Sequence, residues 1–332
     1  MSNLDRAAVE QLTLAAGLGP VQHLVPLTGG ANNRVLRVET AAGPAIAKAY
    51  FRHPSDPRDR LGAEWAFARF AWAAGVRCVA QPLAVAPAAG LGLFAWLDGQ
   101  AIAEATPARV EQAGAFIRAL NAARWRPLAS RLPIASEACF SLAEHLATVG
   151  RRVEHLSTRA EPPAQDFART ELLPVWHQVR DFVRDSGWAL DGILPVTARC
   201  VSPSDFGFHN ARERRDGTVD FLDFEYAGWD DPAKLICDFF CQPRVPVPRH
   251  WFDGFAEAIA ASFPDPAAVV ARARLLLPVY QVKWVCIRLN EFLPGGAQRR
   301  AFARPGEPLG SRQARQLAEA RAAVHQLTRI TI

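Results

Sequence analysis

The chain has 332 residues, half of them hydrophobic, and a formal net charge of +5. Its composition excludes a wholly disordered chain, and its length predicts about two domains. The basic excess is modest and no block of like charges occurs, so we expect no nucleic-acid partner. No apolar leader and no apolar run of about 18 residues appears, so we expect no membrane span and a cytoplasmic protein.

The first 97 residues predict an α+β lobe. Helical spacing occurs over residues 4–16 and 58–74. Strand-like alternation occurs in five segments, namely 21–27, 34–39, 45–50, 78–86 and 91–97. Turn signals such as Gly29-Gly30 separate the first three segments, which is typical of an antiparallel meander. We therefore predict a five-stranded antiparallel sheet with one main helix.

Beyond Asp98-Gly99, which resembles a hinge, the chain is mainly helical, apart from a β-rich stretch over 199–225. The predicted helices are 107–124, 138–156, 164–187, 231–241, 248–262, 266–276, 278–293 and 311–328. Pro162-Pro163 and residues 295–308 are predicted to be loops. Two lobes follow, an N-terminal lobe of residues 1–97 and a larger helical lobe of residues 98–332.

A glycine pair, Gly29-Gly30, lies between two predicted strands and is followed by Asn32. A dinucleotide fingerprint or a Walker loop would lead into a helix, so neither interpretation fits. A strand–glycine–strand turn is instead typical of the hairpin that covers phosphates in kinase-type folds. An ordinary hairpin turn stays open as the alternative.

Lys48 is one of only three lysines, with Lys234 and Lys283, in a chain whose basic residues are mostly arginine. It lies inside an apolar strand, where an ammonium needs an anionic partner or a route to water. Glu64 is on the following helix. A strand lysine paired with a helix glutamate holds ATP phosphates in kinases. A solvent-facing lysine on a half-exposed strand is the other interpretation.

The pattern Asp-x-x-x-x-Asn at Asp205 and Asn210 is followed by Asp223 at the end of an apolar strand. Phosphoryl transfer explains each residue: Asp205 would accept the proton of an attacking hydroxyl, and oxygen ligands from Asn210 and Asp223 would hold Mg²⁺. Each residue alone also fits a turn. Their joint spacing after Lys48 and Glu64 predicts a kinase site.

These segments resemble the aminoglycoside phosphotransferase and choline kinase-like superfamily over about residues 20–295. The matching segments are Gly29–Val35, Lys48, Glu64, Ser204–Asn210, Asp223–Glu225 and Trp229–Ala233. The resemblance implies a two-lobed protein-kinase-like fold that uses ATP and Mg²⁺. It also implies that adenine contacts the hinge near Phe94, Trp96 and Leu97.

Two features depart from that superfamily. Pro203-Ser204 replaces the His-Gly pair that commonly precedes the catalytic aspartate, which questions the support of the loop. His209 could compensate, although a surface histidine in a turn is the favoured interpretation. Lys234 stands where an aspartate is frequent, and Asp238 one helical turn later could replace that aspartate.

The resemblance implies a small-molecule hydroxyl as acceptor, such as that of a sugar, an amino alcohol or an aminoglycoside. Four residues are candidates for substrate contact, namely Trp229, Asp231, Lys283 and Asn290. The Pro203-Ser204 departure leaves open a pseudokinase that binds nucleotide without turnover. A protein kinase would need a long activation segment, which is absent after Asp223. The protein is expected to be a monomer or a homodimer.

Overall fold

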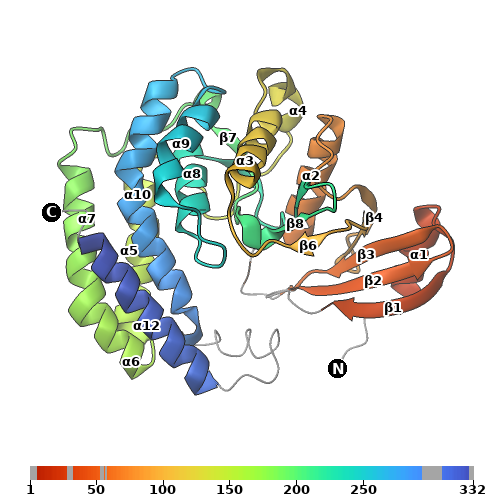
Figure 1. Ribbon diagram of the computed structural model, residues 1–332, viewed down its shortest axis with the longest axis horizontal. Coiled ribbons are helices and arrows are strands. Elements are labelled where there is room, and N and C mark those ends of the chain that lie inside the picture. The colour runs from red at the N-terminus through yellow and green to blue at the C-terminus, as the bar shows by residue number, and fades with distance from the viewer. Residues whose placement is uncertain (1–5, 28–32, 53–55, 57, 294–308, 329–332) are drawn as a thin grey trace. The chain divides into compact units, whose positions relative to one another are not determined.

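The computed structural model describes residues 6–27, 33–52, 56, 58–293 and 309–328. Chain contacts divide the molecule into two compact units, each made of two stretches of sequence (Figure 1). The first unit comprises Met1–Ser136 and Val201–Trp229, and the second comprises Glu137–Cys200 and Asp230–Ile332. The lobe boundary proposed after residue 97 stays a prediction.

The first unit contains the predicted five-stranded antiparallel sheet, in the order β1-β2-β3-β5-β4. Its strands are β1 (Val21–Leu27), β2 (Arg34–Thr40), β3 (Gly43–Ala49), β4 (Pro82–Ala86) and β5 (Leu91–Ala95). Lys48 in β3 pairs with Val35 of β2 and with Gly92 of β5. The lysine therefore lies in a central strand, and its burial shows that the alternative of a solvent-facing lysine was wrong.

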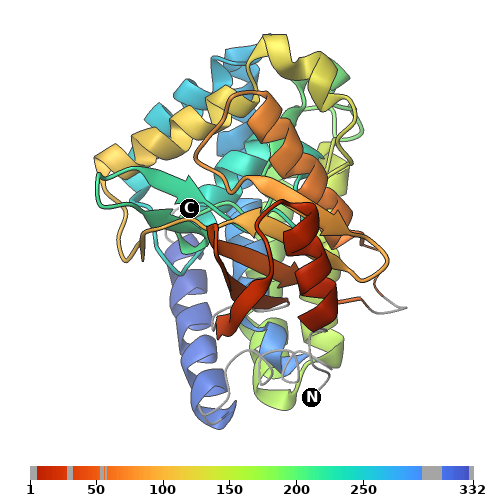
Figure 2. The same cartoon turned by 90° about the vertical axis from the view of Figure 1, so that its right-hand side faces the viewer.

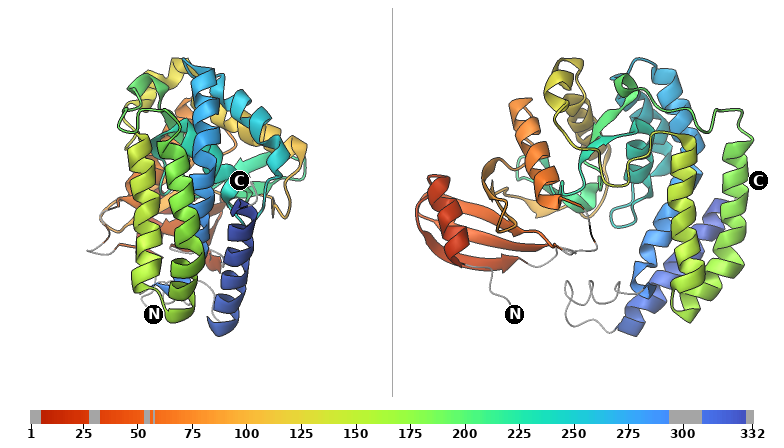
Figure 3. Two further views of the ribbon diagram at one scale, coloured as in Figure 1. Left: turned by 90° about the vertical axis from the view of Figure 1, so that its left-hand side faces the viewer. Right: turned by 180° about the vertical axis from the view of Figure 1, so that it is seen from behind.

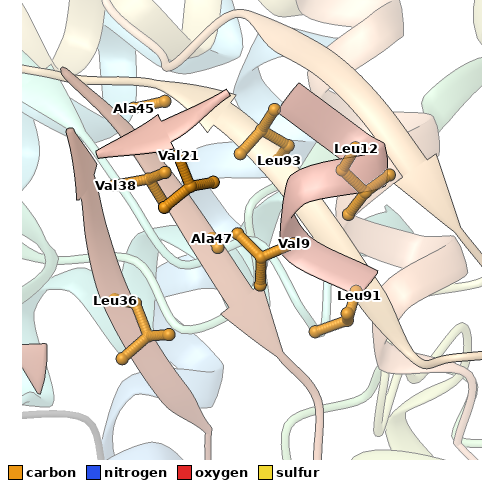
Figure 4. Close-up of a cluster of buried hydrophobic side chains, with 9 residues drawn as sticks. All are labelled: Val9, Leu12, Val21, Leu36, Val38, Ala45, Ala47, Leu91 and Leu93. Atoms are coloured by element: carbon orange, nitrogen blue, oxygen red, sulfur yellow. The ribbon is translucent and has the colours of Figure 1, made fainter. Parts of the chain in front are cut away.

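One face of the sheet is covered by α1 (Arg6–Ala15), drawn in red in Figure 2. Its buried side chains Val9 and Leu12 pack against aliphatic residues of the strands (Figure 4). Ala45 and Ala47 of β3 belong to the same cluster. Because successive side chains of a strand alternate between faces, Lys48 points to the opposite face of the sheet.

The helix α2 (Arg60–Ala73) packs on β4 and β5 and supplies Glu64. Asp59 caps its first turn, accepting a hydrogen bond from the Gly62 amide at 2.9 Å. Such a cap satisfies an amide that the helix itself leaves unpaired.

The remainder of the first unit joins residues 98–136 to residues 201–229. It contains α3 (Pro107–Leu120), α4 (Arg126–Ala129) and a small sheet of β6 (Gln100–Ala101), β8 (Ala211–Glu213) and β9 (Val219–Phe221). Phe116 of α3 stacks on Phe221 with ring centroids 4.5 Å apart, and Phe67 of α2 meets Phe224 at 4.4 Å. Aromatic packing thus ties the short strands to the helices.

The second unit is helical. Its helices are α5 (Leu142–Arg159), α6 (Pro162–Phe167), α7 (Leu173–Arg184), α8 (Pro232–Cys241), α9 (Phe252–Ala260), α10 (Pro266–Arg288) and α12 (Leu309–Thr328). The long helix α10 contacts α5, α7, α8, α9 and α12 (Figure 3). The chain passes between the two units after Ser136, within β7 (Cys200–Ser202) and within β10 (Gly228–Asp230).

Three sequence expectations were wrong in this unit. The helices predicted over 266–276 and 278–293 are the single helix α10, with Pro278 inside it. Burial of most of its length compensates for the hydrogen bond that proline removes. Pro162 begins α6 instead of forming a loop, because proline suits the first helical turn. The helix predicted over 164–187 is divided by a π-turn at Ala168–Leu172.

Within the described residues, no helix is long and apolar enough to cross a membrane.

Candidate active site

Lys48 is 7% exposed and is held by two carboxylates of the first unit. Its Nζ donates to Glu64 Oε2 at 2.6 Å and to Asp223 Oδ1 at 2.5 Å. The Tyr50 hydroxyl also donates to Glu64 Oε2, at 2.7 Å. Burial disfavours the ammonium, but the charges of Asp223 and Glu64 outweigh it and raise the pKa of Lys48 above its ordinary value. The lysine is therefore a fixed cation, paired with Glu64 as the sequence predicts.

Asp223 follows β9 in a backbone conformation that is unusual for its residue type. Among the described residues, three non-glycines have positive φ, namely Glu137, Ser204 and Asp223, and the φ of Asp223 is 65°. Its side chain is 39% exposed, whereas the side chain of Lys48 is only 9% exposed. Strained backbone of this kind persists where the surrounding structure enforces it, often at functional sites. The carboxylate thus reaches both the buried lysine and solvent.

The segment that carries Asp205 is fixed from its start. Asn121, at the end of α3, exchanges two hydrogen bonds with the backbone of Val201 in β7, at 3.0 and 2.7 Å. Ser204, the residue before Asp205, has φ of 68°, so the conformation that glycine favours is adopted here by serine. Phe206 and Phe208 are buried and anchor the segment after Asp205. The Asp205 side chain itself stays 38% exposed.

Asn210 joins this segment to the Asp223 segment. Its Nδ2 donates to the Asp205 carbonyl at 2.9 Å, and its own carbonyl accepts from the Leu222 amide at 2.9 Å. The next residue, Ala211 of β8, pairs with Phe221 of β9, so the two segments are also joined as neighbouring strands. The structure therefore brings together the three residues Asp205, Asn210 and Asp223 that the spacing predicts.

The donor set fits Mg²⁺. Because Nδ2 of Asn210 is used by the Asp205 carbonyl, the amide oxygen is left on the other side of the group. An amide oxygen and a carboxylate are hard ligands, and Mg²⁺ usually takes one or two protein groups and completes its shell with phosphates and water. In the part of the chain that is described, no group of three or more His, Cys, Asp or Glu forms a metal site.

Sequence reasoning missed the contacts of His209 and Asn33. The His209 side chain is only 8% exposed, so the favoured interpretation as a surface turn residue is wrong; Nε2 lies 3.3 Å from Asp205 Oδ1. Asn33 Nδ2 donates to Glu225 Oε2 at 2.8 Å, and Arg60 Nη1 lies 3.6 Å from the same oxygen. No local feature of the sequence around Asn33 or His209 indicates either contact.

The predicted nucleotide contacts are partly described. Gly29, Gly30 and Asn32 lie outside the described residues. Phe94 is buried in β5, whereas Trp96 and Leu97 are half-buried in the segment that follows. The Trp96 indole donates to Asp98 Oδ1 at 2.7 Å. A role of these residues in adenine binding stays a prediction.

The four substrate candidates differ in their surroundings. In the first unit, the half-buried Trp229 donates from Nε1 to the Ala129 carbonyl at 3.0 Å. In the second unit, Asp231 is fully buried and caps α8, and Asn290 is half-buried at the start of a 3₁₀ turn. Lys283 is 6% exposed and donates to both oxygens of Asp238 at 2.9 Å. Substrate contact by these residues stays a prediction.

The second unit contains two buried ionic groups. Asp231 accepts from His145 Nε2 at 3.0 Å and from Arg272 Nε at 2.6 Å, while His145 Nδ1 meets the Tyr280 hydroxyl at 2.6 Å. Burial disfavours the charge of Asp231, yet His145 and Arg272 lower its pKa to about 2. The hydrogen bond to Asp231 outweighs burial and raises the pKa of His145.

In the second group, Lys234 donates to Asp230 at 2.5 Å, and Asp238 accepts from Lys283 and from the Trp284 indole. All three lysines of the chain are therefore buried and paired with a carboxylate. Lysine carries a compact ammonium and arginine a planar guanidinium, so the two are not interchangeable at a buried ion pair.

No protein-family model and no curated protein matches the chain. Solved structures are similar to it over nearly the whole length. Choline kinase LicA from Streptococcus pneumoniae is 13% identical with a TM-score of 0.59, covering 98% of this chain and 100% of its own. A mutant of aminoglycoside phosphotransferase APH(4)-Ia, in complex with ADP and hygromycin B, is 17% identical with a TM-score of 0.57, covering 96% and 98%.

An ethanolamine kinase from Plasmodium vivax is 11% identical with a TM-score of 0.56, covering 94% of this chain and 86% of its own. At these identities the likeness concerns the fold. It confirms the predicted kinase-like α+β fold, and it agrees with the resemblance that the sequence motifs carry.

Proposed function

We propose that the protein is an ATP-dependent phosphotransferase that transfers the γ-phosphate to a hydroxyl group of a small molecule. The observation that carries this proposal is the pair of contacts from Lys48 to Glu64 and Asp223. A buried cation held between a helix glutamate and a second, solvent-reaching carboxylate is the arrangement that positions phosphates in kinases. A solved structure of similar fold that contains ADP and hygromycin B adds support.

Each residue has a role in this proposal. Lys48 binds phosphate oxygens while Glu64 fixes its direction. Asn210 and Asp223 would hold Mg²⁺, which offsets phosphate charge when bound. Asp205 accepts the proton of the acceptor hydroxyl as its oxygen attacks the γ-phosphorus. A new oxygen–phosphorus bond forms, the bond to the β–γ bridging oxygen breaks, and ADP leaves.

The acceptor is proposed only as a small molecule with a free hydroxyl, such as a sugar, an amino alcohol or an aminoglycoside. The charge of Lys283 is already balanced by Asp238 within the second unit, so this lysine gives little reason to propose an anionic acceptor. The pseudokinase alternative rests on Pro203-Ser204. It is weakened by the backbone of Ser204, which adopts the positive φ that glycine favours although the residue is a serine.

The test is nucleotide binding followed by turnover. MgADP is expected to raise the melting temperature of the wild type, and Asp223→Ala to remove that shift. ADP release from MgATP is then measured with a panel of sugars, amino alcohols and aminoglycosides. A wild type that binds neither MgATP nor MgADP would contradict the proposal, and binding without turnover of any acceptor or of water would favour the pseudokinase.

A further inference from the structure

His209 lies in the loop of the candidate active site with its ring turned inward. Its side chain is 8% exposed, although the Asp205 side chain that it contacts is 38% exposed. The ring nitrogen Nε2 is 3.3 Å from Asp205 Oδ1. A buried ring therefore contacts the accessible carboxylate that the proposed reaction uses.

The surroundings of the ring determine which nitrogen carries the proton. A carboxylate is only an acceptor, so the contact is a hydrogen bond when Nε2 donates. The other nitrogen, Nδ1, is buried and has no hydrogen-bond partner among the described residues. A buried N–H without an acceptor is rarer and costlier than an unused lone pair. A proton on Nε2 and none on Nδ1 satisfies both observations.

Two consecutive residues hold Asp205 at two points. Asn210 donates to its backbone carbonyl at 2.9 Å, and His209 meets its carboxylate. Phe208, which is 1% exposed, fixes the backbone just before them. On the other side of Asp205, Pro203 has no side-chain donor that could hold the carboxylate.

We propose that His209 is a positioning residue that fixes the Asp205 carboxylate through an Nε2–H donor. Oδ1 is the oxygen of the carboxylate that the imidazole holds. This inference rests on the proposed phosphotransferase function. It assigns to the residue directly before Asn210 a support of the Asp205 carboxylate that Pro203 cannot give.

Three substitutions separate this role from simple packing. His209→Gln keeps an N–H donor near the place of Nε2, His209→Asn moves its amide toward the place of Nδ1, and His209→Ala removes the donor. The activity readout is ADP release from MgATP with water as acceptor. The second readout is the two-bond ¹H–¹⁵N spectrum of the imidazole rings in nucleotide-free protein, with the His209 signal identified by its loss in His209→Gln.

We expect His209→Ala and His209→Asn to lower kcat about ten- to a hundredfold with little change in KM for MgATP, because the carboxylate is misplaced. His209→Gln is expected to retain kcat within about threefold of the wild type. The wild-type spectrum should show the Nε2–H form of His209, and Asp205→Ala should remove that preference. The melting temperature and the MgADP shift of each variant report whether it folds.

Equal activity in all three variants, or an equal loss in all three, would overturn the proposal, as would an Nδ1–H form in the wild type. A wild type that releases no ADP is a failure of the proposed function itself. In that case the spectrum alone decides whether His209 holds Asp205.

Discussion

Asn33 Nδ2 and Glu225 Oε2 are 2.8 Å apart, although 192 residues separate them in the chain. Both side chains are buried, at 8% and 3% exposure. The contact joins the residue before β2, just after the predicted phosphate-covering turn, to the residue two positions after Asp223. It therefore connects two predicted parts of the nucleotide site within the first unit.

The Asn33–Glu225 contact is expected to be energetically coupled. Asn33→Ala and Glu225→Gln should each lower the free energy of unfolding by about 1.5–3 kcal/mol, because the first removes the donor and the second removes the charge of the acceptor. The double variant should lose less than the sum of the two, by about 1 kcal/mol. Denaturant unfolding measures these values, and strict additivity would show that the contact is energetically silent. The partly exposed Arg109–Glu213 pair of the same unit is the control, with a coupling below about 1 kcal/mol.

Ser204→Gly should stabilise the protein. The φ of 68° costs a non-glycine residue roughly 1 kcal/mol, which glycine avoids, so a gain of about 0.5–1 kcal/mol is expected. Ser204→Val should lower stability by more than about 1 kcal/mol, because a branched side chain tolerates this conformation least. Thermal unfolding tests both. Ser202→Gly is the matched control and should destabilise, since the Ser202 hydroxyl accepts the Ser204 amide at 3.0 Å; a loss of stability in Ser204→Gly would refute the argument.

Asp231 should make the stability of the protein depend on acid pH. Its pKa is about 2 in the folded state, against about 3.9 in an unfolded chain. The unfolded state therefore binds the proton first, so this contribution is complete above about pH 4 and is lost as the pH falls toward 2. The size is about 2–3 kcal/mol.

The raised pKa of His145 acts in the opposite direction. Its contribution is complete below the unfolded histidine pKa of about 6.5 and is lost as the pH rises through the folded value. Unfolding free energies measured from pH 2 to 8 test both the loss of stability in acid and the loss of stability above neutral pH. In Asp231→Asn the unfolding free energy should fall less steeply between about pH 4 and pH 2. An unchanged slope in that variant would show that other groups cause the acid dependence.

Lys283 is expected to stabilise the second unit through Asp238. Lys283→Met alone leaves a buried carboxylate without one of its partners and should cost about 3–5 kcal/mol. The double variant Lys283→Met/Asp238→Leu should recover much of that loss, because the unpaired charge is gone. Chemical denaturation gives the comparison, with the more exposed Arg288–Glu319 pair as control. Full stability in Lys283→Met would instead favour the predicted substrate contact.

The sheet and the Asp205, Asn210 and Asp223 set could be predicted because their signals are local. Alternation marks a strand, and the three residues follow each other at short spacing in one stretch of chain. The prediction divided α10 into two helices because a proline such as Pro278 usually ends a helix. Only burial in the folded structure shows that the helix continues through it.

Contacts between distant residues had no such signal. Nothing near Asn33 in the sequence indicates Glu225, and a lone histidine in a loop has no periodicity to show which way it points. The rarity of lysine was the usable clue, since all three lysines prove to be buried and paired.

The first unit is discontinuous in sequence, and this has a consequence for its synthesis. The rings of Phe116 and Phe67 have their partners Phe221 and Phe224 about a hundred residues or more later in the chain. A nascent chain that ends at residue 136 lacks those partners and exposes apolar surface, which promotes aggregation. Folding of this unit must wait until residue 229 has left the ribosome, so an expression fragment of the first unit has to include residues 201–229.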